Sequence, residues 1–375
     1  MKYLKNCKAV LLITSLDDAV IAMEDGQIAG IYPAAKAKIP ENAEIIDGQG
    51  LFAGPGYVDM HCHGGGVYKS HTDPEGVAKH HLQGGTTTMN LTLYHSFGHE
   101  VECRMMETVR RLKAEGKLPN VNGVHLEGPY LSRQYGAHPE TARDICREEY
   151  TKTIQDYGDI IRLWTVSPEL EGAAGFISAA AGAGIVVAIG HSAASLEQID
   201  QAVDLGATVC THIADATGGP ILPCRQGGTI ECDFNVGVML RDEVFCEMIN
   251  DSMGRHVRHA MTRFITKAVG IDRVCGITDC EVNTNGSTLD VNLYEGTKLA
   301  GSFLTMEAVA RNFSRNTCLS MTEVFRVCSY NPARALRISH EVGSLAVGKR
   351  ANLVLINENY DLHGVILDGS VVVKK

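Results

Sequence analysis

Between residues 53 and 336, short apolar runs alternate with longer stretches of helical character. Eight of the runs have the length of β-strands, and they cover residues 55–63, 84–92, 122–128, 161–169, 184–191, 207–212, 243–250 and 273–280. Strands that alternate with helices form parallel sheets. Eight such units predict an α/β fold, a closed (β/α)8 barrel of the TIM type.

An open, doubly wound sheet is the alternative for this pattern. Such sheets usually carry a glycine-rich nucleotide motif after a strand. The sequence has no G-x-G-x-x-G after its first strand and no G-x-x-x-x-G-K-[ST]. The closed barrel is therefore the preferred interpretation.

The two ends of the chain have a different pattern, with short strands joined by tight turns. Asp25-Gly26 and Asp368-Gly369 each lie between two apolar runs, which is a strong hairpin signal. We expect residues 1–52 and 337–375 to pair into one small β-sandwich domain. Residues 53–336 would then form the catalytic barrel.

Composition narrows the range of partners. The chain has 375 residues, of which 45% are hydrophobic and 21% charged, and its net charge is −10 with no basic tract. This balance argues against nucleic acid and membrane partners. Its 12 cysteines include no C-x-x-C pair, and the first residues lack the long apolar core of a signal peptide. We expect a cytoplasmic protein with reduced thiols.

The segment "GYVDMHCHGG", residues 56–65, ends the first predicted strand. Alternate side chains of a strand point to the same face, so Asp59, His61 and His63 would share one face. The two histidines would lie roughly 7 Å apart along the strand, close enough to converge on one cation. Asp59 is more readily interpreted as a supporting carboxylate than as a ligand.

Further residues that can bind metals lie at the ends of other predicted strands. The full set of candidates is His61, His63, Glu127, His191, His212 and Asp279. All six fall at the C-terminal ends of strands, the face that carries the active site in barrels of this kind. Imidazole and carboxylate ligands suit zinc, and also iron, manganese or cobalt. Glu127 could bridge two ions, so we expect one or two divalent cations per chain.

Asp279 could also act in catalysis. A carboxylate beside an activated water can accept its proton and pass it to a leaving nitrogen. This chemistry is the metal-assisted hydrolysis of an amide or a related C–N bond.

The chain resembles the amidohydrolase superfamily and, within it, the N-acetylglucosamine-6-phosphate deacetylases. The resemblance runs nearly end to end and rests on "PGYVDMHCHGG", "GVHLEGPYLSRQYGAHPE", "AIGHSAAS", "CTHIADA", "GITDC" and "NPARALRI". It implies that Glu127, His191 and His212 hold one metal, that Asp279 is the general acid and base, and that the protein is a homodimer. It also implies a small-molecule substrate, an N-acylated amino sugar that can carry a phosphate.

The resemblance further implies substrate contacts at His138, Asp215, Ala216, Arg225 and His256. Asp215 stands where family members have an asparagine that helps to hold the phosphate. An ionised carboxylate there would repel a phosphate dianion. Either Asp215 turns away, for instance to pair with Arg225, or the substrate is a different N-acyl compound.

Two other functions stay open. The same metal chemistry could hydrolyse a different N-acyl or cyclic C–N substrate, and a barrel without activity could serve as a scaffold.

Some residues are expected to be structural. Glu169 is interpreted as a structural carboxylate and Ser192 as the N-cap of the next helix. Histidines outside the strand-end pattern are expected at the surface or in loops, namely His71, His80, His81, His95 and His99.

Overall fold

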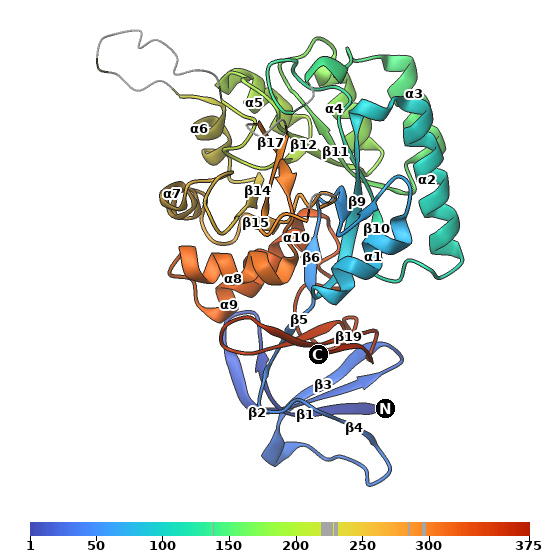
Figure 1. Cartoon of the computed structure of the whole chain (residues 1–375), viewed down its shortest axis with the longest axis vertical. Coiled ribbons are helices and arrows are strands. Elements are labelled where there is room, and N and C mark those ends of the chain that lie inside the picture. Colours follow the sequence, from blue (N-terminus) through green and yellow to red (C-terminus); the bar gives the residue numbers. More distant parts are fainter. Residues whose placement is uncertain (138, 219–227, 229–231, 284–285, 295–297) are drawn as a thin grey trace.

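The computed structural model describes residues 1–137, 139–218, 228, 232–283, 286–294 and 298–375. Two eight-stranded sheets account for most of the strands in this part of the chain. One sheet forms a barrel surrounded by helices, and the other lies at one end of the barrel and carries both chain termini (Figure 1).

The barrel sheet has eight parallel strands in chain order. They are β6 (Tyr57–Asp59), β9 (Thr86–Tyr94), β10 (Val121–Glu127), β11 (Ile161–Val166), β12 (Val186–Ile189), β13 (Ala207–Cys210), β14 (Phe245–Ile249) and β15 (Val274–Ile277). Each falls within or overlaps one of the eight predicted runs. The predicted (β/α)8 barrel is thus confirmed.

Within the described parts of the chain, each barrel strand is followed by a helix. These helices are α1 (Pro74–Gln83), α2 (His99–Ala114), α3 (Arg147–Tyr157), α4 (Ala173–Gly182), α5 (Leu196–Asp204), α6 (Phe234–Met239), α7 (His259–Val269) and α8 (Met306–Asn316). Each buries one apolar face, as Ile199, Ala202 and Val203 do in α5. Two short helices follow, α9 (Met321–Phe325) and α10 (Asn331–Ala335).

The N-cap of α5 differs from the expectation. Ser195, not Ser192, caps this helix, and Ser195 and Gln198 form a reciprocal capping box. Ser192 instead donates a 2.6 Å hydrogen bond to the Glu169 carboxylate, which also accepts from the backbone N–H of Ala193. Glu169 therefore ties down the loop after β12, as expected for a structural carboxylate.

The barrel closes where its last strand returns to its first. Cys62 and Cys280 form a parallel β-bridge just beyond β6 and β15. The backbone N–H of Asp279 donates to the carbonyl of His61 at 2.9 Å. Below this bridge, the Thr278 hydroxyl donates to the fully buried Asp59 carboxylate at 2.6 Å. Asp59 thus joins the two strands and has a supporting role in the fold.

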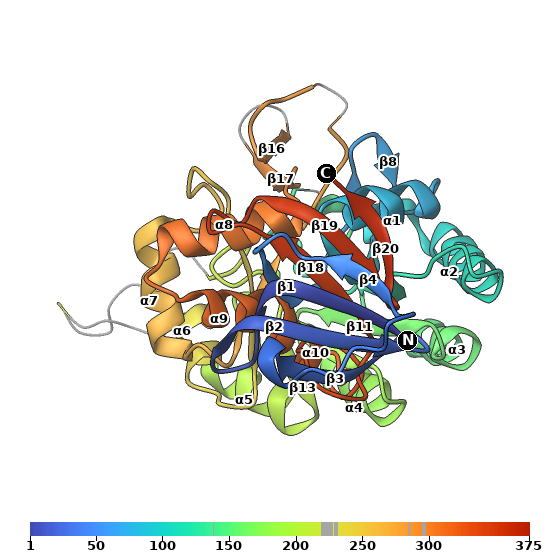
Figure 2. The same cartoon turned by 90° about the horizontal axis from the view of Figure 1, so that it is seen from below.

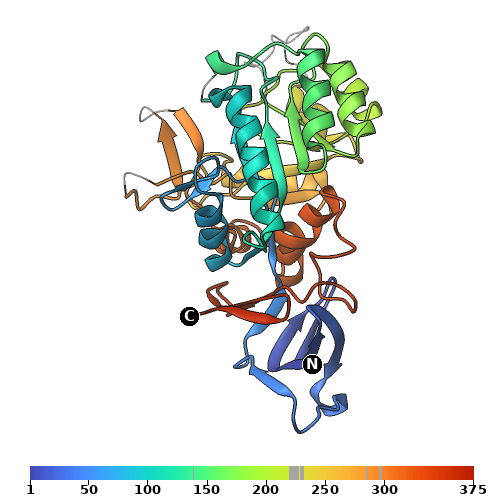
Figure 3. The same cartoon turned by 90° about the vertical axis from the view of Figure 1, so that its right-hand side faces the viewer.

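The second sheet combines strands from both ends of the chain (Figures 2 and 3). Its strands are β1 (Lys2–Val10), β2 (Ser15–Glu24), β3 (Gln27–Pro33), β4 (Glu44–Asp47), β5 (Phe52–Pro55), β18 (Leu353–Ile356), β19 (Leu362–Leu367) and β20 (Ser370–Lys374). The hairpins at Asp25-Gly26 and Asp368-Gly369 are present as predicted. Leu4, Ile21, Leu353 and Ile366 pack in one core, so the two ends fold together.

Four short strands and four short helical turns complete the secondary structure of the described residues. The strands are β7 (Gly64–Gly65), β8 (Tyr68–Lys69), β16 (Val291–Tyr294) and β17 (Lys298–Ser302), and the turns are η1 (Ala34–Lys36), η2 (His95–Phe97), η3 (Pro139–Thr141) and η4 (Arg326–Tyr330). Among the described residues, no helix has the length and apolarity that crossing a membrane requires.

One histidine expected near the surface is buried. His81 in α1 is fully enclosed, and its Nε2 donates to the carbonyl of Gly64 at 2.8 Å. Burial lowers the pKa of His81 to about 4, so the ring is neutral. The expectation for His81 was wrong because a histidine on the inner face of a helix can replace water with a carbonyl from a neighbouring loop.

Candidate active site and metal-binding residues

The candidate ligands lie at the mouth of the barrel because of their positions relative to the strand ends. Glu127 is the last residue of β10. His191, His212 and Asp279 each follow the last residue of a strand by two positions, and His61 has the same place after β6. Parallel strands end at one rim, so these side chains meet there.

Three of these residues have a strained backbone. His191, His212 and Asp279 have positive φ angles of 50°, 25° and 46°. A non-glycine residue in this region costs on the order of 1–3 kcal/mol and persists only where the surrounding structure enforces it. Such strain clusters at functional sites. Here it occurs at the three positions where the chain bends away from the end of a barrel strand.

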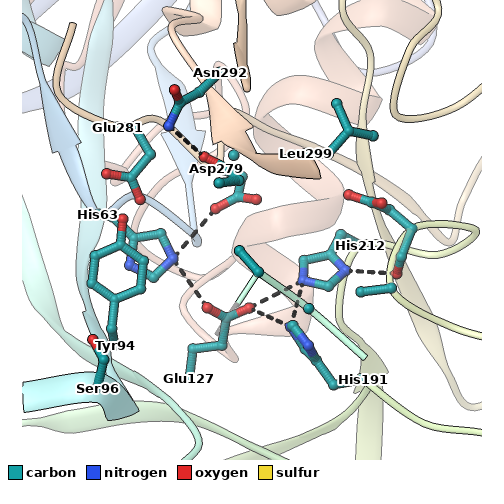
Figure 4. A pocket seen from close by; sticks show the side chains of 16 residues that line it. His63, Tyr94, Ser96, Glu127, His191, His212, Asp279, Glu281, Asn292 and Leu299 are labelled. Atoms are coloured by element: carbon teal, nitrogen blue, oxygen red, sulfur yellow. Dashed lines mark hydrogen bonds and ion pairs between the residues drawn. The ribbon is translucent and has the colours of Figure 1, made fainter. Parts of the chain in front are cut away.

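Glu127 lies at the centre of the group (Figure 4). Its Oε1 is 3.0 Å from Nε2 of both His191 and His212, and its Oε2 is 3.1 Å from Nε2 of His63. Nε2 of His61 is 3.5 Å from Oε1 of Glu127. A single carboxylate therefore contacts all four imidazoles.

The ligand atoms fall into two groups, one of His61, His63 and Asp279 and one of Glu127, His191 and His212. Within each group the atoms lie within 4.8 Å of one another. Nε2 of His61 is 3.2 Å from Nε2 of His63, and Nε2 of His191 is 3.1 Å from Nε2 of His212. Pairs of imidazole nitrogens that face each other beside carboxylates fit a divalent cation.

The directions of the pKa shifts at the site show that its residues stabilise positive charge. Burial lowers the pKa of His63 and His212, but hydrogen bonds and charges from Asp279 and Glu127 outweigh it, and each pKa rises to about 9. Burial opposes ionisation of Glu127, but the positive charge of His61 and hydrogen bonds from His191 and His212 hold its pKa well below the usual value. Protons on the imidazoles thus balance the carboxylates, a role that a bound cation takes over.

Two of the imidazoles are oriented by contacts at their other ring nitrogen. Nδ1 of His212 donates to the backbone carbonyl of Asp215 at 3.0 Å. Nδ1 of His61 donates to Glu247 at 3.1 Å. Such contacts hold the proton on Nδ1 and leave the Nε2 lone pair for a ligand role.

Glu247 was not among the predicted residues. It lies within the otherwise uncharged strand "FCEMI", where an acidic residue has to find a partner if it is buried. That lone charge was the signal in the sequence. Its partner, His61, could not be identified without the tertiary structure.

A cavity of about 220 Å³ opens above Glu127. Its walls include Tyr94, which stacks on His63 with ring centroids 3.9 Å apart, and Asn292, which donates to the carbonyl of Ala300 at 2.7 Å. Glu281 also lines the cavity, and burial raises its pKa to about 7. The described lining contains no lysine or arginine.

The predicted substrate-contacting residues have different places. Asp215 and Ala216 line the cavity. His256 does not: it is buried behind the wall, where Nδ1 lies 3.1 Å from Asp251 and Nε2 donates to the carbonyl of Gly301. His138 and Arg225 lie outside the described residues, so the suggested pairing of Asp215 with Arg225 is untested.

Comparison with known proteins agrees with this arrangement. Residues 52–372 match the amidohydrolase family. The N-acetylglucosamine-6-phosphate deacetylase of Homo sapiens is 30% identical over 88% of this chain and 85% of its own length, and that of Lysinibacillus sphaericus is 28% identical over 94% and 92%. A mutant N-acetyl-D-glucosamine-6-phosphate deacetylase from Mycobacterium smegmatis, solved in complex with N-acetyl-D-glucosamine-6-phosphate, superposes with a TM-score of 0.87 and 29% identity over 100% of this chain and 99% of its own.

The family match covers the whole barrel and, of the terminal sheet, β5, β18, β19 and part of β20. The family implies a divalent metal that the buried histidine and carboxylate groups could hold. The chain therefore belongs to the amidohydrolase family of hydrolytic enzymes, among relatives that are N-acetylglucosamine-6-phosphate deacetylases.

Proposed function

We propose that this enzyme removes the acetyl group from a phosphorylated N-acetylated amino sugar, with N-acetylglucosamine-6-phosphate as the first candidate. The observation that carries the proposal is the position of Asp279 at the base of the cavity. Its Oδ1 lies 3.4 Å from Nε2 of His61 and 3.3 Å from Nε2 of His63, next to the Glu127 carboxylate. Relatives with this activity match nearly the whole chain.

The metal is proposed to be zinc, with iron, manganese and cobalt as alternatives. Imidazole and carboxylate ligands without thiolate suit all four. The two ligand groups would suit two ions, one held by His61, His63 and Asp279 and one by Glu127, His191 and His212, although the second group would suffice for a single ion. Such a cation supplies Lewis acidity that polarises an amide carbonyl and makes a water molecule more acidic.

Asp279 would transfer the proton in the reaction. Burial opposes its ionisation, but the charges of His61 and His63 outweigh this effect and lower its pKa below the ordinary value. The carboxylate is then in its basic form at neutral pH. It would accept the proton of the attacking water and return it to the amide nitrogen as the C–N bond breaks, which releases acetate and the free amine.

A second candidate function, hydrolysis of a different N-acyl or cyclic C–N substrate, is favoured by the acidic lining of the cavity. Asp215 and Glu281 line it together with Glu127 and Asp279. A carboxylate about 4 Å from a phosphate charge costs roughly 4 kcal/mol at an effective dielectric constant of 20. A phosphate would need donors that offset this repulsion, and the described lining supplies no lysine or arginine for that purpose.

The test compares kcat/KM for N-acetylglucosamine-6-phosphate, N-acetylgalactosamine-6-phosphate, the unphosphorylated sugars and a panel of N-acyl and cyclic amides, in the wild type and in Asp215→Asn. A strong preference for a phosphorylated sugar in the wild type, unchanged by the substitution, supports the deacetylase and makes Asp215 a bystander. Poor turnover of the phosphorylated sugars, improved in Asp215→Asn, supports the second function. Less than one metal ion per chain and no hydrolysis at all would support the inactive scaffold.

Other properties stay predictions. They are the homodimer, the cytoplasmic location, the lack of nucleic acid and membrane partners, and the division into residues 1–52 plus 337–375 and residues 53–336.

A further inference from the structure

Glu247 is a carboxylate in the interior of the barrel. It lies in the middle of β14 and is 0% exposed. Its neighbours on the adjoining strands include Cys275, its register partner on β15. Burying an ionised carboxylate among apolar groups is costly unless a hydrogen bond or an opposite charge compensates.

The compensation comes from two candidate ligands that are distant in the sequence. Oε2 of Glu247 lies 3.1 Å from Nδ1 of His61 and accepts from the backbone N–H of His212 at 3.4 Å. Oε1 has no hydrogen-bond partner among the described residues. Glu247 thus contacts one member of each group of candidate ligands.

The ring of His61 is held from a second side. The ring of His125 meets it edge to face with centroids 4.6 Å apart. His125 is itself fixed between the hydroxyls of Thr92 and Thr165, at 3.2 Å and 2.9 Å. His61 therefore has one orientation in which Nδ1 reaches Glu247 and Nε2 faces His63 and Asp279.

We propose that Glu247 is a positioning residue for the metal centre. Glu247 keeps the proton of His61 on Nδ1, and the Nε2 lone pair of His61 is then directed toward His63 and Asp279. The inference rests on the proposed role of His61 as a metal ligand. An acidic partner on a ligating histidine fixes its tautomer and strengthens its binding, and loss of such a partner typically costs about 10- to 100-fold in metal affinity.

The test measures binding of Zn²⁺ to the metal-free full-length protein by competition with a chromogenic chelator. In Glu247→Gln the side chain keeps its shape, but its amide can donate to Nδ1 and so move the proton of His61 to Nε2. The expected result is an affinity for Zn²⁺ about 10- to 100-fold weaker at the site that contains His61. Glu102→Gln is the matched control, because Glu102 is also buried and ion-paired, with Arg143, but lies in α2 away from the site.

A double-mutant cycle with His61→Asn separates positioning from general destabilisation. If Glu247 acts through His61, Glu247→Gln weakens Zn²⁺ binding in the wild type and adds nothing in the His61→Asn background. Equal losses in both backgrounds, or unchanged binding in Glu247→Gln while His61→Asn binds weakly, overturn the inference and leave the proposed function intact. Unchanged binding in His61→Asn overturns the ligand role of His61 itself.

Glu247→Asp keeps the measurement possible if Glu247→Gln fails to fold. Aspartate retains the charge but is one methylene shorter, so its carboxylate cannot reach Nδ1 of His61 with the backbone in place. We expect weakened Zn²⁺ binding here as well. Wild-type affinity in this variant would contradict the inference, because charge without the contact would then be sufficient.

Discussion

At the scale of single residues, Glu127 is the centre of the candidate site, since its two carboxylate oxygens contact all four imidazoles. A residue with contacts to both ligand groups cannot be replaced without affecting both. This distinguishes Glu127 from Glu281, which lines the same cavity but belongs to neither group.

Glu127→Gln is expected to lose metal and activity together. The amide keeps one weak oxygen ligand, but it loses the charge that offsets the cation and the second oxygen that bridges the two groups. Metal content after gel filtration and kcat/KM should both fall, whereas Glu281→Gln should keep its metal. Full metal content and full rate in Glu127→Gln would remove Glu127 from the ligand set.

Asp279→Asn is expected to keep the metal held by Glu127, His191 and His212 and to lose most turnover. Asparagine has nearly the same shape as aspartate, and its amide oxygen can still face the site, but it cannot accept a proton. The loss of a general base should lower kcat by about 10²-fold or more. The measurement is kcat beside the metal content of the same sample, and a kcat near that of the wild type would rule out the acid and base role.

At the scale of elements, the barrel depends on the contact between its first and last strands. Glu127, His191 and His212 lie at the ends of strands that pair continuously in the sheet. His61 and Asp279 lie on the two sides of the contact between the first and last strands, here called the seam. The carboxylate of Asp59 and the hydroxyl of Thr278 hold this seam from within.

Thr278→Val is expected to destabilise the protein by about 1–3 kcal/mol, because it leaves the buried Asp59 carboxylate without its shortest hydrogen bond. Urea unfolding followed by fluorescence of Trp164, the single tryptophan, would measure the change. Thr153→Val is the control, since the buried hydroxyl of Thr153 donates only to the carbonyl of Glu149 in its own helix. Equal shifts of the urea midpoint in the two variants would contradict a special role for the seam.

At the scale of the whole molecule, the centre couples metal binding to stability and pH. Without a cation, His63 and His212, each with a pKa of about 9, carry a proton below that pH, and their positive charges compensate the buried carboxylates. These raised pKa values stabilise the metal-free fold at low pH, and the stabilisation is lost as the pH rises through about 9. A cation must displace the same protons, so the affinity of the site for the cation increases as the pH rises toward 9.

The increase in melting temperature on adding Zn²⁺ to the metal-free enzyme is therefore expected to grow with pH. Each displaced proton weakens binding about tenfold per pH unit below 9, and ligand stabilisation follows the affinity. Thermal unfolding at pH 6, 7 and 8 with a buffered Zn²⁺ concentration would show the trend. An increase of the same size at all three pH values would mean that the imidazoles are neutral before the metal binds.

Periodic patterns in the sequence were enough to predict the barrel, the two terminal hairpins and the rim on which the six candidate ligands lie. The physical reason is local: an apolar run flanked by helical segments has to become a buried parallel strand, and a polar residue just past its end has to face the rim. The family motifs carried the same information. The ligand roles of these residues stay predictions, although the geometry brings all six together.

Contacts between distant segments were beyond the reach of these patterns. His61 and Glu247 are separated by 186 positions, and Asp59 and Thr278 by 219. The burial of His81 and the capping of α5 by Ser195 also depended on which loop or side chain packed beside each residue. A strand pattern states only that a side chain points inward. The closure of the barrel determines which side chain it meets there, because closure brings the first and last strands, and the side chains of facing strands, into contact.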